Sequence, residues 1–169
     1  MIIIADTREQ KPWSFMDHDV ERKSLKEGDY TTKELLKLEK TTGRKTVRIE
    51  RKASTSELAG NLGTNLVRFE KEMDKLLDYE EKYIICEFSM MDVLQFPKNS
   101  GIPRHQMYKK NKAGKFIYKI KMTPDMLLSK IEYITNIYEI EFIYAGDRAN
   151  AMVIAQEILE NAHKEKIKG

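Results

Sequence analysis

One short stretch of the chain sets an acid, a guanidinium and an ammonium group at neighbouring positions. The segment VRIERKASTSEL, residues 47–58, begins like a strand, ends like a helix and contains Glu50, Arg51 and Lys52 in a row. Side chains alternate along a strand, so Glu50 and Lys52 are expected on one face and Arg51 on the other. The spacing alone also fits a surface strand with an exposed ion pair, which contributes little stability.

A second carboxylate, Asp29, follows the turn signal of Gly28 upstream of this strand. If Asp29 comes beside Glu50 on an adjoining strand, the two carboxylates and the backbone carbonyl of Arg51 offer oxygen ligands to a hard divalent cation such as Mg²⁺. Lys52 would then orient a water or offset charge on a phosphate oxygen. Such a set suits the hydrolysis of a phosphodiester.

The other residues that commonly carry chemistry are sparse. Cys86 is the one cysteine, and the run YIICEF around it reads as a buried strand in which the thiol is structural. His18, His105 and His163 lie far apart, without the short spacings typical of zinc ligands. Carboxylates and lysines are therefore the expected source of any chemistry.

The positive charge of the chain is concentrated in one window. The net charge is only +3, yet residues 93–124 contain no Asp or Glu. This window is expected to contact an anionic partner, with its aromatic residues Tyr108, Phe116 and Tyr118 available to stack on unpaired bases. The alternative is a solvated hairpin arm. The basic residues of the window are Lys98, Arg104, Lys109, Lys110, Lys112, Lys115, Lys119 and Lys121.

Hydrophobic periodicity predicts an α/β fold with a mixed sheet flanked by helices. A capping box at Ser54 and Glu57 starts a helix that runs toward Leu62, while the segment 33–40 fits either a helical turn or a hairpin. Strands are expected at residues 1–5, 20–25, 46–51, 82–88 and 139–144, and further helices at 66–76, 127–138 and 152–162.

Four pieces of sequence in this order, IIIADTREQ, GDY, IERK and RFEKE, resemble the nuclease domain of the XPF family of structure-specific DNA endonucleases. The resemblance implies a restriction-endonuclease-like fold and a single XPF-type nuclease domain over residues 1–169, with a basic insertion at about 97–122 and no helix-hairpin-helix domain. It also implies a Mg²⁺- or Mn²⁺-dependent endonuclease that cuts branched, flap or junction DNA.

The same resemblance assigns roles to individual residues. It implies that Asp29 and Glu50 bind metal together with Arg51, which also shapes the site, and that Lys52 is catalytic. Asp6 and Glu9 match acidic catalytic positions of the family, with Arg8 as the basic residue between them, and Arg68 matches an arginine near the active site. The alternatives are a strand-end cap for Asp6, a structural ion pair between Arg8 and Glu9, and a solvated helix face for Arg68. The predicted DNA-binding residues are Arg8, Arg68, Arg104, Lys109, Lys110, Lys112 and Lys115.

One position departs from the family motif, which reads G-D-(gap)-E-R-K-x-x-x-D. The motif ends in Asp where this chain has Ser56. Glu57, the next residue, either caps the helix or replaces this Asp from one position further along the chain. If neither residue replaces the Asp, either one metal contact or a supporting hydrogen bond is lost. The alternative function is therefore a DNA-binding module of the same fold with impaired catalysis.

Composition limits the location and the partners of the chain. No apolar run approaches the roughly 20 residues of a membrane span, and the amino-terminal apolar run is too short for a signal sequence. We expect an intracellular protein, cytoplasmic or nucleoid-associated, with DNA as partner and with homodimerisation through the nuclease domain's own helices as a possibility.

Overall fold

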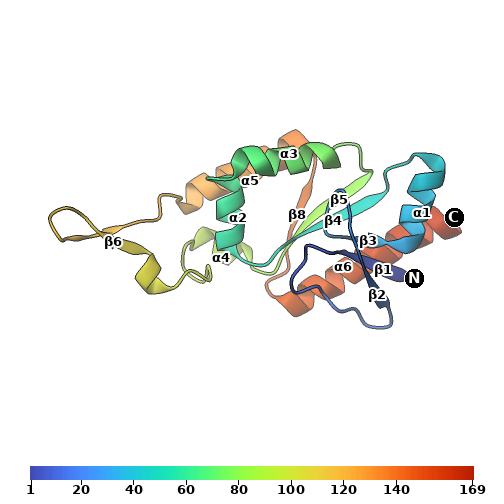
Figure 1. Cartoon of the computed structure of the whole chain (residues 1–169), viewed down its shortest axis with the longest axis horizontal. Helices are drawn as coiled ribbons and strands as arrows, with labels where there is room; N and C mark the ends of the chain where they lie inside the picture. Colours follow the sequence, from blue (N-terminus) through green and yellow to red (C-terminus); the bar gives the residue numbers. More distant parts are fainter.

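A six-stranded mixed sheet forms the centre of the computed structural model, which describes residues 1–169 (Figure 1). The strand order is β2-β1-β3-β4-β5-β8. β1 runs parallel to β2 and antiparallel to β3, β4 runs antiparallel to β3, and β4, β5 and β8 are mutually parallel. The strands are β1 (Ile2–Asp6), β2 (Asp19–Lys23), β3 (Tyr30–Thr32), β4 (Val47–Lys52), β5 (Glu81–Cys86) and β8 (Glu141–Tyr144).

Helices cover both faces of this sheet, so the predicted mixed α/β architecture is confirmed. The helices are α1 (Lys33–Thr42), α2 (Thr55–Leu62), α3 (Leu66–Leu76), α4 (Met90–Leu94), α5 (Pro124–Tyr138) and α6 (Arg148–His163), with short helical turns η1 (Arg104–Gln106) and η2 (Lys164–Lys168). None of these helices combines the length and the apolar character needed to cross a bilayer.

Two apolar cores lie on opposite faces of the sheet. One contains buried residues of α2, α3 and α5, such as Leu58, Met73 and Ile131, together with Ile84 of β5. The other contains residues of α1 and α6, such as Leu35 and Ala155, together with strand residues. The sheet is thus buried on both sides, as expected where parallel strands are joined through helices.

β4 has a different face toward each core. Val47 and Ile49 pack into the core on the α1 and α6 side. Because side chains alternate, Glu50 and Lys52 point to the opposite side, toward α2 and α3. Consecutive residues at the end of this strand therefore reach different layers of the molecule.

Several element bounds differ from the sequence prediction. The segment that fitted either a helical turn or a hairpin is α1, because Thr32 caps it by accepting a hydrogen bond from the Leu35 backbone N–H. The strand expected at residues 20–25 is the edge strand β2 at Asp19–Lys23, and α6 begins at Arg148, four residues before the predicted start. β3 and α4 had no predicted counterpart.

The basic window forms a separate arm. β6 (Tyr108–Lys110) and β7 (Phe116–Tyr118) pair with each other as an antiparallel hairpin and with no strand of the main sheet. The hairpin projects away from the body of the molecule, at the end opposite to α1 (Figure 1).

Candidate active site

A polar pocket of about 390 Å³ lies where the loop before β3 and the end of β4 meet α2 and α3. It contains Asp29, Glu50 and Lys52 together, which are the three residues that sequence spacing singled out. Only one lining side chain, Phe69, is hydrophobic. The complete lining is Arg8, Gly28, Asp29, Glu50, Lys52, Glu57, Asn61, Asn65, Arg68, Phe69 and Glu72.

Backbone hydrogen bonds hold Asp29 at the junction of β1 and β4. The Asp29 N–H donates to the carbonyl of Ile49 at 2.8 Å, and the Asp6 N–H donates to the carbonyl of Asp29 at 2.8 Å. The Arg51 N–H donates to the Asp29 carboxylate oxygen Oδ2, also at 2.8 Å. Asp29 is therefore fixed relative to β4 through both its main chain and its side chain.

The turn before Asp29 requires glycine. Gly28 has φ +69°, and a Cβ at this position would lie 3.2 Å from both Cβ and Cδ of Arg48. A left-handed conformation combined with this close approach favours a residue without a side chain. The predicted turn role of Gly28 agrees with this geometry.

Lys52 lies among the acidic side chains of the pocket. Its Nζ atom is 3.1 Å from Oε1 of Glu50 and 3.7 Å from Oε1 of Glu57, and it lies 5.3 Å from the ring centre of Phe69. Burial alone would lower the pKa of Lys52, but the charges of Glu50, Glu57 and Asp29 outweigh it and raise the pKa. Lys52 is therefore a buried ammonium at neutral pH.

Asp29 and Glu50 act on each other electrostatically. Burial and then the negative charge of Glu50 raise the pKa of Asp29 well above its ordinary value, although the Arg51 N–H and Lys52 partly oppose this effect. Two carboxylates in one pocket stabilise bound cations, because a cation relieves their mutual repulsion.

The donor set fits a cation that keeps part of its hydration shell. No three Asp, Glu, His or Cys side chains of the chain gather in an arrangement ready to hold a metal ion. Mg²⁺ usually binds one or two carboxylates and retains several waters, so Asp29 and Glu50 in a polar pocket suit it. Mn²⁺ favours the same oxygen ligands.

The side chain of Arg51 lies on the other face of β4. It donates to Glu9 at 2.8 Å and to Glu87 at 2.7 Å, and both ion pairs are largely buried. Glu87 also accepts from the indole N–H of Trp13 at 2.6 Å and pairs with Arg148 at 3.3 Å. The side chains of Arg51 and Glu9 therefore lie behind the pocket, although the charge of Glu9 still helps to raise the pKa of Asp29.

Asp6 does not line the pocket itself, and its carboxylate is held by Arg8 and Leu25. Its carboxylate is fully buried and accepts hydrogen bonds from the Arg8 N–H at 2.9 Å, from Arg8 Nε at 2.6 Å and from the Leu25 N–H at 2.6 Å. Burial raises the pKa of Asp6, but the hydrogen bonds from Arg8 and Leu25 outweigh it and the net pKa is lowered. Asp6 thereby fixes Arg8, whose exposed side chain lines the pocket.

Glu57 and Ser56 make different contacts at the start of α2. Ser54 caps the helix by accepting from the Glu57 N–H at 3.2 Å, and the Glu57 carboxylate accepts from the Ala53 N–H at 2.9 Å. Glu57 nevertheless also faces Lys52 and lines the pocket, whereas the Ser56 hydroxyl bonds to the Ser54 hydroxyl at 2.9 Å. Capping and a place in the pocket are thus compatible for Glu57.

Three further lining residues were not predicted: Asn61, Asn65 and Glu72. A signal for two of them was present, because Asn61 follows Glu57 by four positions and Glu72 follows Arg68 by four. Residues at this spacing share one face of a helix. Arg68 itself lies in the pocket, so its polar helix face is also the wall of the site.

The predicted DNA-binding residues of the basic window lie outside this pocket. Lys109 and Lys110 belong to β6, Lys112 and Lys115 to the turn of the arm, and Arg104 to η1. All five are exposed.

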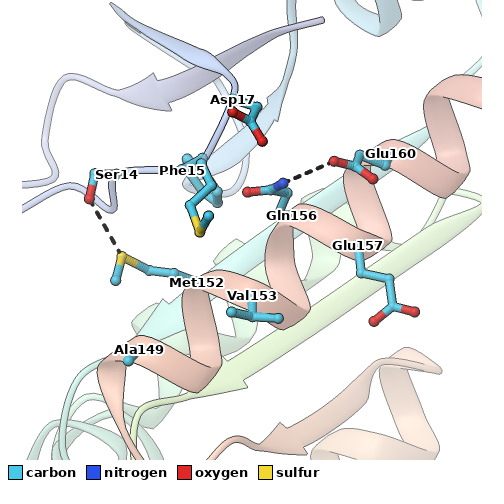
Figure 2. Close-up of a pocket in the computed structure, with 10 residues that line it drawn as sticks. Ser14, Phe15, Asp17, Ala149, Met152, Val153, Gln156, Glu157 and Glu160 are labelled. Atoms are coloured by element: carbon cyan, nitrogen blue, oxygen red, sulfur yellow. Dashed lines mark hydrogen bonds between the residues drawn. The ribbon is translucent and has the colours of Figure 1, made fainter.

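A larger groove of about 530 Å³ lies on the other face of the molecule, between the segment after β1 and α6 (Figure 2). Phe15, Met16 and Met152 line it together with the acidic residues Asp17 and Glu160, and no Lys or Arg contributes. The Ser14 hydroxyl donates to the Met152 sulfur across it at 3.8 Å (Figure 2). An apolar and acidic surface disfavours a phosphate backbone, so this groove is no candidate for binding DNA.

No protein-family model matches the chain, and no curated protein matches it. Among solved structures, XPF from Aeropyrum pernix is similar, with a TM-score of 0.58 and 18% sequence identity over 99% of this chain. The same protein in complex with DNA gives a TM-score of 0.58 and 18% identity over 98% of this chain. In both comparisons the match covers 66% of the XPF chain. The chain therefore has a mixed α/β fold similar to that of XPF.

Proposed function

We propose that the protein is a Mg²⁺- or Mn²⁺-dependent endonuclease that hydrolyses phosphodiester bonds in branched, flap or junction DNA. The observation that carries this proposal is the gathering of Asp29, Glu50 and Lys52 in one polar pocket. The fold similarity to XPF, including its complex with DNA, supports the choice of substrate.

Within this proposal, Asp29 and Glu50 hold the ion, with the backbone carbonyl of Arg51 as the third oxygen ligand. A divalent ion bound there supplies a Lewis acid that stabilises charge on the phosphoryl oxygens. In hydrolysis, a water oxygen forms a bond to phosphorus, one ester P–O bond breaks, and the leaving oxygen takes up a proton.

Lys52 has the position and charge to act on the scissile phosphate. Its ammonium group is held by Glu50 and Glu57 on the pocket side of β4. A cation fixed in advance stabilises the extra negative charge of the transition state without reorganisation. Arg8 and Arg68 line the same pocket and are proposed to contact phosphates beside the scissile one.

Cleavage assays with metal-site variants test this proposal. Labelled flap, fork, four-way-junction and plain duplex DNA are incubated with Mg²⁺ or Mn²⁺ and the parent chain, Glu50→Gln or Lys52→Ala. We expect structure-specific cleavage by the parent and a loss of at least about a hundredfold in either variant, the usual scale when one group that stabilises the transition state is removed.

Lys33→Ala is a matched control, because Lys33 forms an exposed ion pair with Glu21 of the edge strand β2 and lies outside the pocket. Its cleavage rate should equal that of the parent. Cleavage by Glu50→Gln and Lys52→Ala at the parental rate, or none by the parent with either metal, would refute the active-site assignment.

A second candidate function is a DNA-binding module that does not cleave. It is favoured by Ser56, which stands where the XPF family motif ends in Asp. The hydroxyl of Ser56 bonds to the hydroxyl of Ser54. A parent chain that binds junction DNA and leaves it intact with both metals would establish this alternative.

A further inference from the structure

The arm presents two chemically different faces. Its strands pair Tyr108 with Tyr118, Lys109 with Ile117, and Lys110 with Phe116. Side chains alternate along each strand, so Tyr108, Lys110, Phe116 and Tyr118 share one face, here called the aromatic face. Lys109 and Ile117 share the other.

Interactions within the arm support this division. The rings of Tyr108 and Tyr118 lie 5.5 Å apart in an edge-to-face arrangement, and Lys110 Nζ lies 5.3 Å from the ring centre of Phe116. Tyr108 and Phe116 also line a concave surface together with Arg104 and His105. The aromatic face therefore combines flat rings with cationic groups beside them.

The hairpin does not depend on these rings for its turn. Asn111 organises the turn, because its side-chain oxygen accepts from the Ala113 and Lys115 N–H groups at 3.0 Å. A backbone bond from Lys119 to Met107 at 2.8 Å extends the ladder beyond the strands. Phe116 is nevertheless 67% exposed. Exposing a phenyl ring to water costs free energy, and a ring that only held the hairpin together would be expected to be more buried.

The charge around the aromatic face selects the kind of ligand. No Asp or Glu occurs between Val93 and Pro124. Exposed rings beside lysines and an arginine match a ligand that has both flat aromatic groups and a polyanionic backbone. In duplex DNA the bases are already stacked on each other, whereas unpaired bases offer their faces to protein rings.

We propose that the aromatic face binds the unpaired bases of single-stranded DNA by stacking, while Lys110 and Arg104 contact its phosphates. The choice of DNA as ligand rests on the proposed function. The arm is then the part of the molecule that recognises the single-stranded branch of a substrate, separately from the pocket that contains Lys52.

Binding without metal separates this proposal from the nuclease proposal. Fluorescence anisotropy in EDTA compares a labelled single strand of about 12 nucleotides, within the usual site sizes of single-strand binders, with a duplex of the same sequence. We expect Phe116→Leu to weaken single-strand binding by roughly fivefold to a hundredfold, the value of one stacked base, and to change duplex binding little.

Ile117→Thr is the matched control, because Ile117 is also exposed in β7 but belongs to the opposite face. This variant should bind both DNAs like the parent. Equal losses of affinity in the two variants, or an unchanged single-strand affinity in Phe116→Leu, would overturn the proposal.

Photocrosslinking of the unmodified protein gives a second test that does not depend on the folding of a variant. Single strands that carry 5-iododeoxyuridine should crosslink on irradiation to Tyr108, Phe116 or Tyr118. Crosslinks confined to other segments, or tighter binding of an RNA strand of the same sequence, would contradict the proposal. Neither of these results bears on whether Glu50→Gln loses metal-dependent cleavage. The two proposals can therefore fail independently.

Discussion

Lys52 is surrounded by more acidic than basic groups. The pocket contains the carboxylates of Asp29, Glu50, Glu57 and Glu72, against the cations of Arg8, Lys52 and Arg68. The raised pKa of Asp29 reflects burial and its repulsion by Glu50. The free pocket therefore favours an added cation, which is the electrostatic basis for the proposed metal binding.

The buried carboxylate of Asp6 leads to a prediction about pH. Because the folded-state pKa of Asp6 lies below its ordinary value of 3.8, its stabilising effect is fully present above that value. The effect disappears as the pH falls through the lowered pKa. Asp6→Asn should reduce the free energy of unfolding at neutral pH by roughly 1–3 kcal/mol. The difference from the parent should shrink below about pH 4.

Urea denaturation at a series of pH values measures this difference. Asp78→Asn is the control, because it removes an exposed carboxylate by the same substitution. A stability loss in Asp6→Asn that stays constant from neutral to acid pH would show that the charge of Asp6 contributes nothing.

At the scale of secondary structure, the elements with clear periodicity were predictable. The stripe of Phe69, Met73 and Leu76 identifies α3, and the cap at Ser54 identifies the start of α2. β3 was missed because three residues buried on both sides show no alternation. The nature of α1 could not be decided because only Leu35 in it is buried, so its stripe is short.

The site was predictable only where its residues lie close in sequence or carry the family motif. Glu50 and Lys52 lie two positions apart on one strand. The position of Asp29 beside them was a hypothesis that rested on the resemblance to the XPF family, because the strand that follows Asp29, β3, was not predicted. The cluster behind β4 was not predictable, because Trp13 and Glu87 are separated by 74 positions. The parallel register of β4 and β5, in which Lys52 pairs with Cys86, places Glu87 beside Arg51.

This cluster behind β4 leads to a stability prediction. Glu87→Ala leaves the guanidinium of Arg51 buried without one of its two carboxylate partners. Removing one partner of a buried ion pair usually costs about 3–5 kcal/mol, so we expect a loss near the lower value because Glu9 remains.

Chemical denaturation of Glu87→Ala and of Glu21→Ala provides the comparison. Glu21 belongs to an exposed pair with Lys33, and its removal should cost less than about 1 kcal/mol. Similar reductions in stability in both variants would mean that Glu87 adds no more than a surface charge.

At the scale of the whole molecule, the positively charged arm and the polar pocket around Lys52 are separate parts. The arm lies at one end and α1 at the other (Figure 1). If the arm contacts the DNA backbone, replacing Lys109, Lys110 and Lys112 together by Gln should flatten the log-log dependence of affinity on salt. On a duplex, the slope should fall by about 0.9 for each phosphate that the arm no longer neutralises.

The control replaces three exposed lysines of α1, Lys33, Lys37 and Lys40, by Gln. Both variants lose the same net charge, so a general electrostatic effect would change both slopes alike. An unchanged slope in the arm variant would show that the arm does not contact the backbone.

Arg51 and Lys52 point to opposite faces of β4, so the number of residues in this strand is constrained. A one-residue insertion in β4 ahead of Glu50 would turn every later side chain of the strand to the other layer. Lys52 would then face the cluster of Glu9 and Glu87, and Arg51 would enter the pocket. Chains that share this architecture should therefore tolerate added or deleted residues in the turn at Asn111 to Lys115 and reject them in β4.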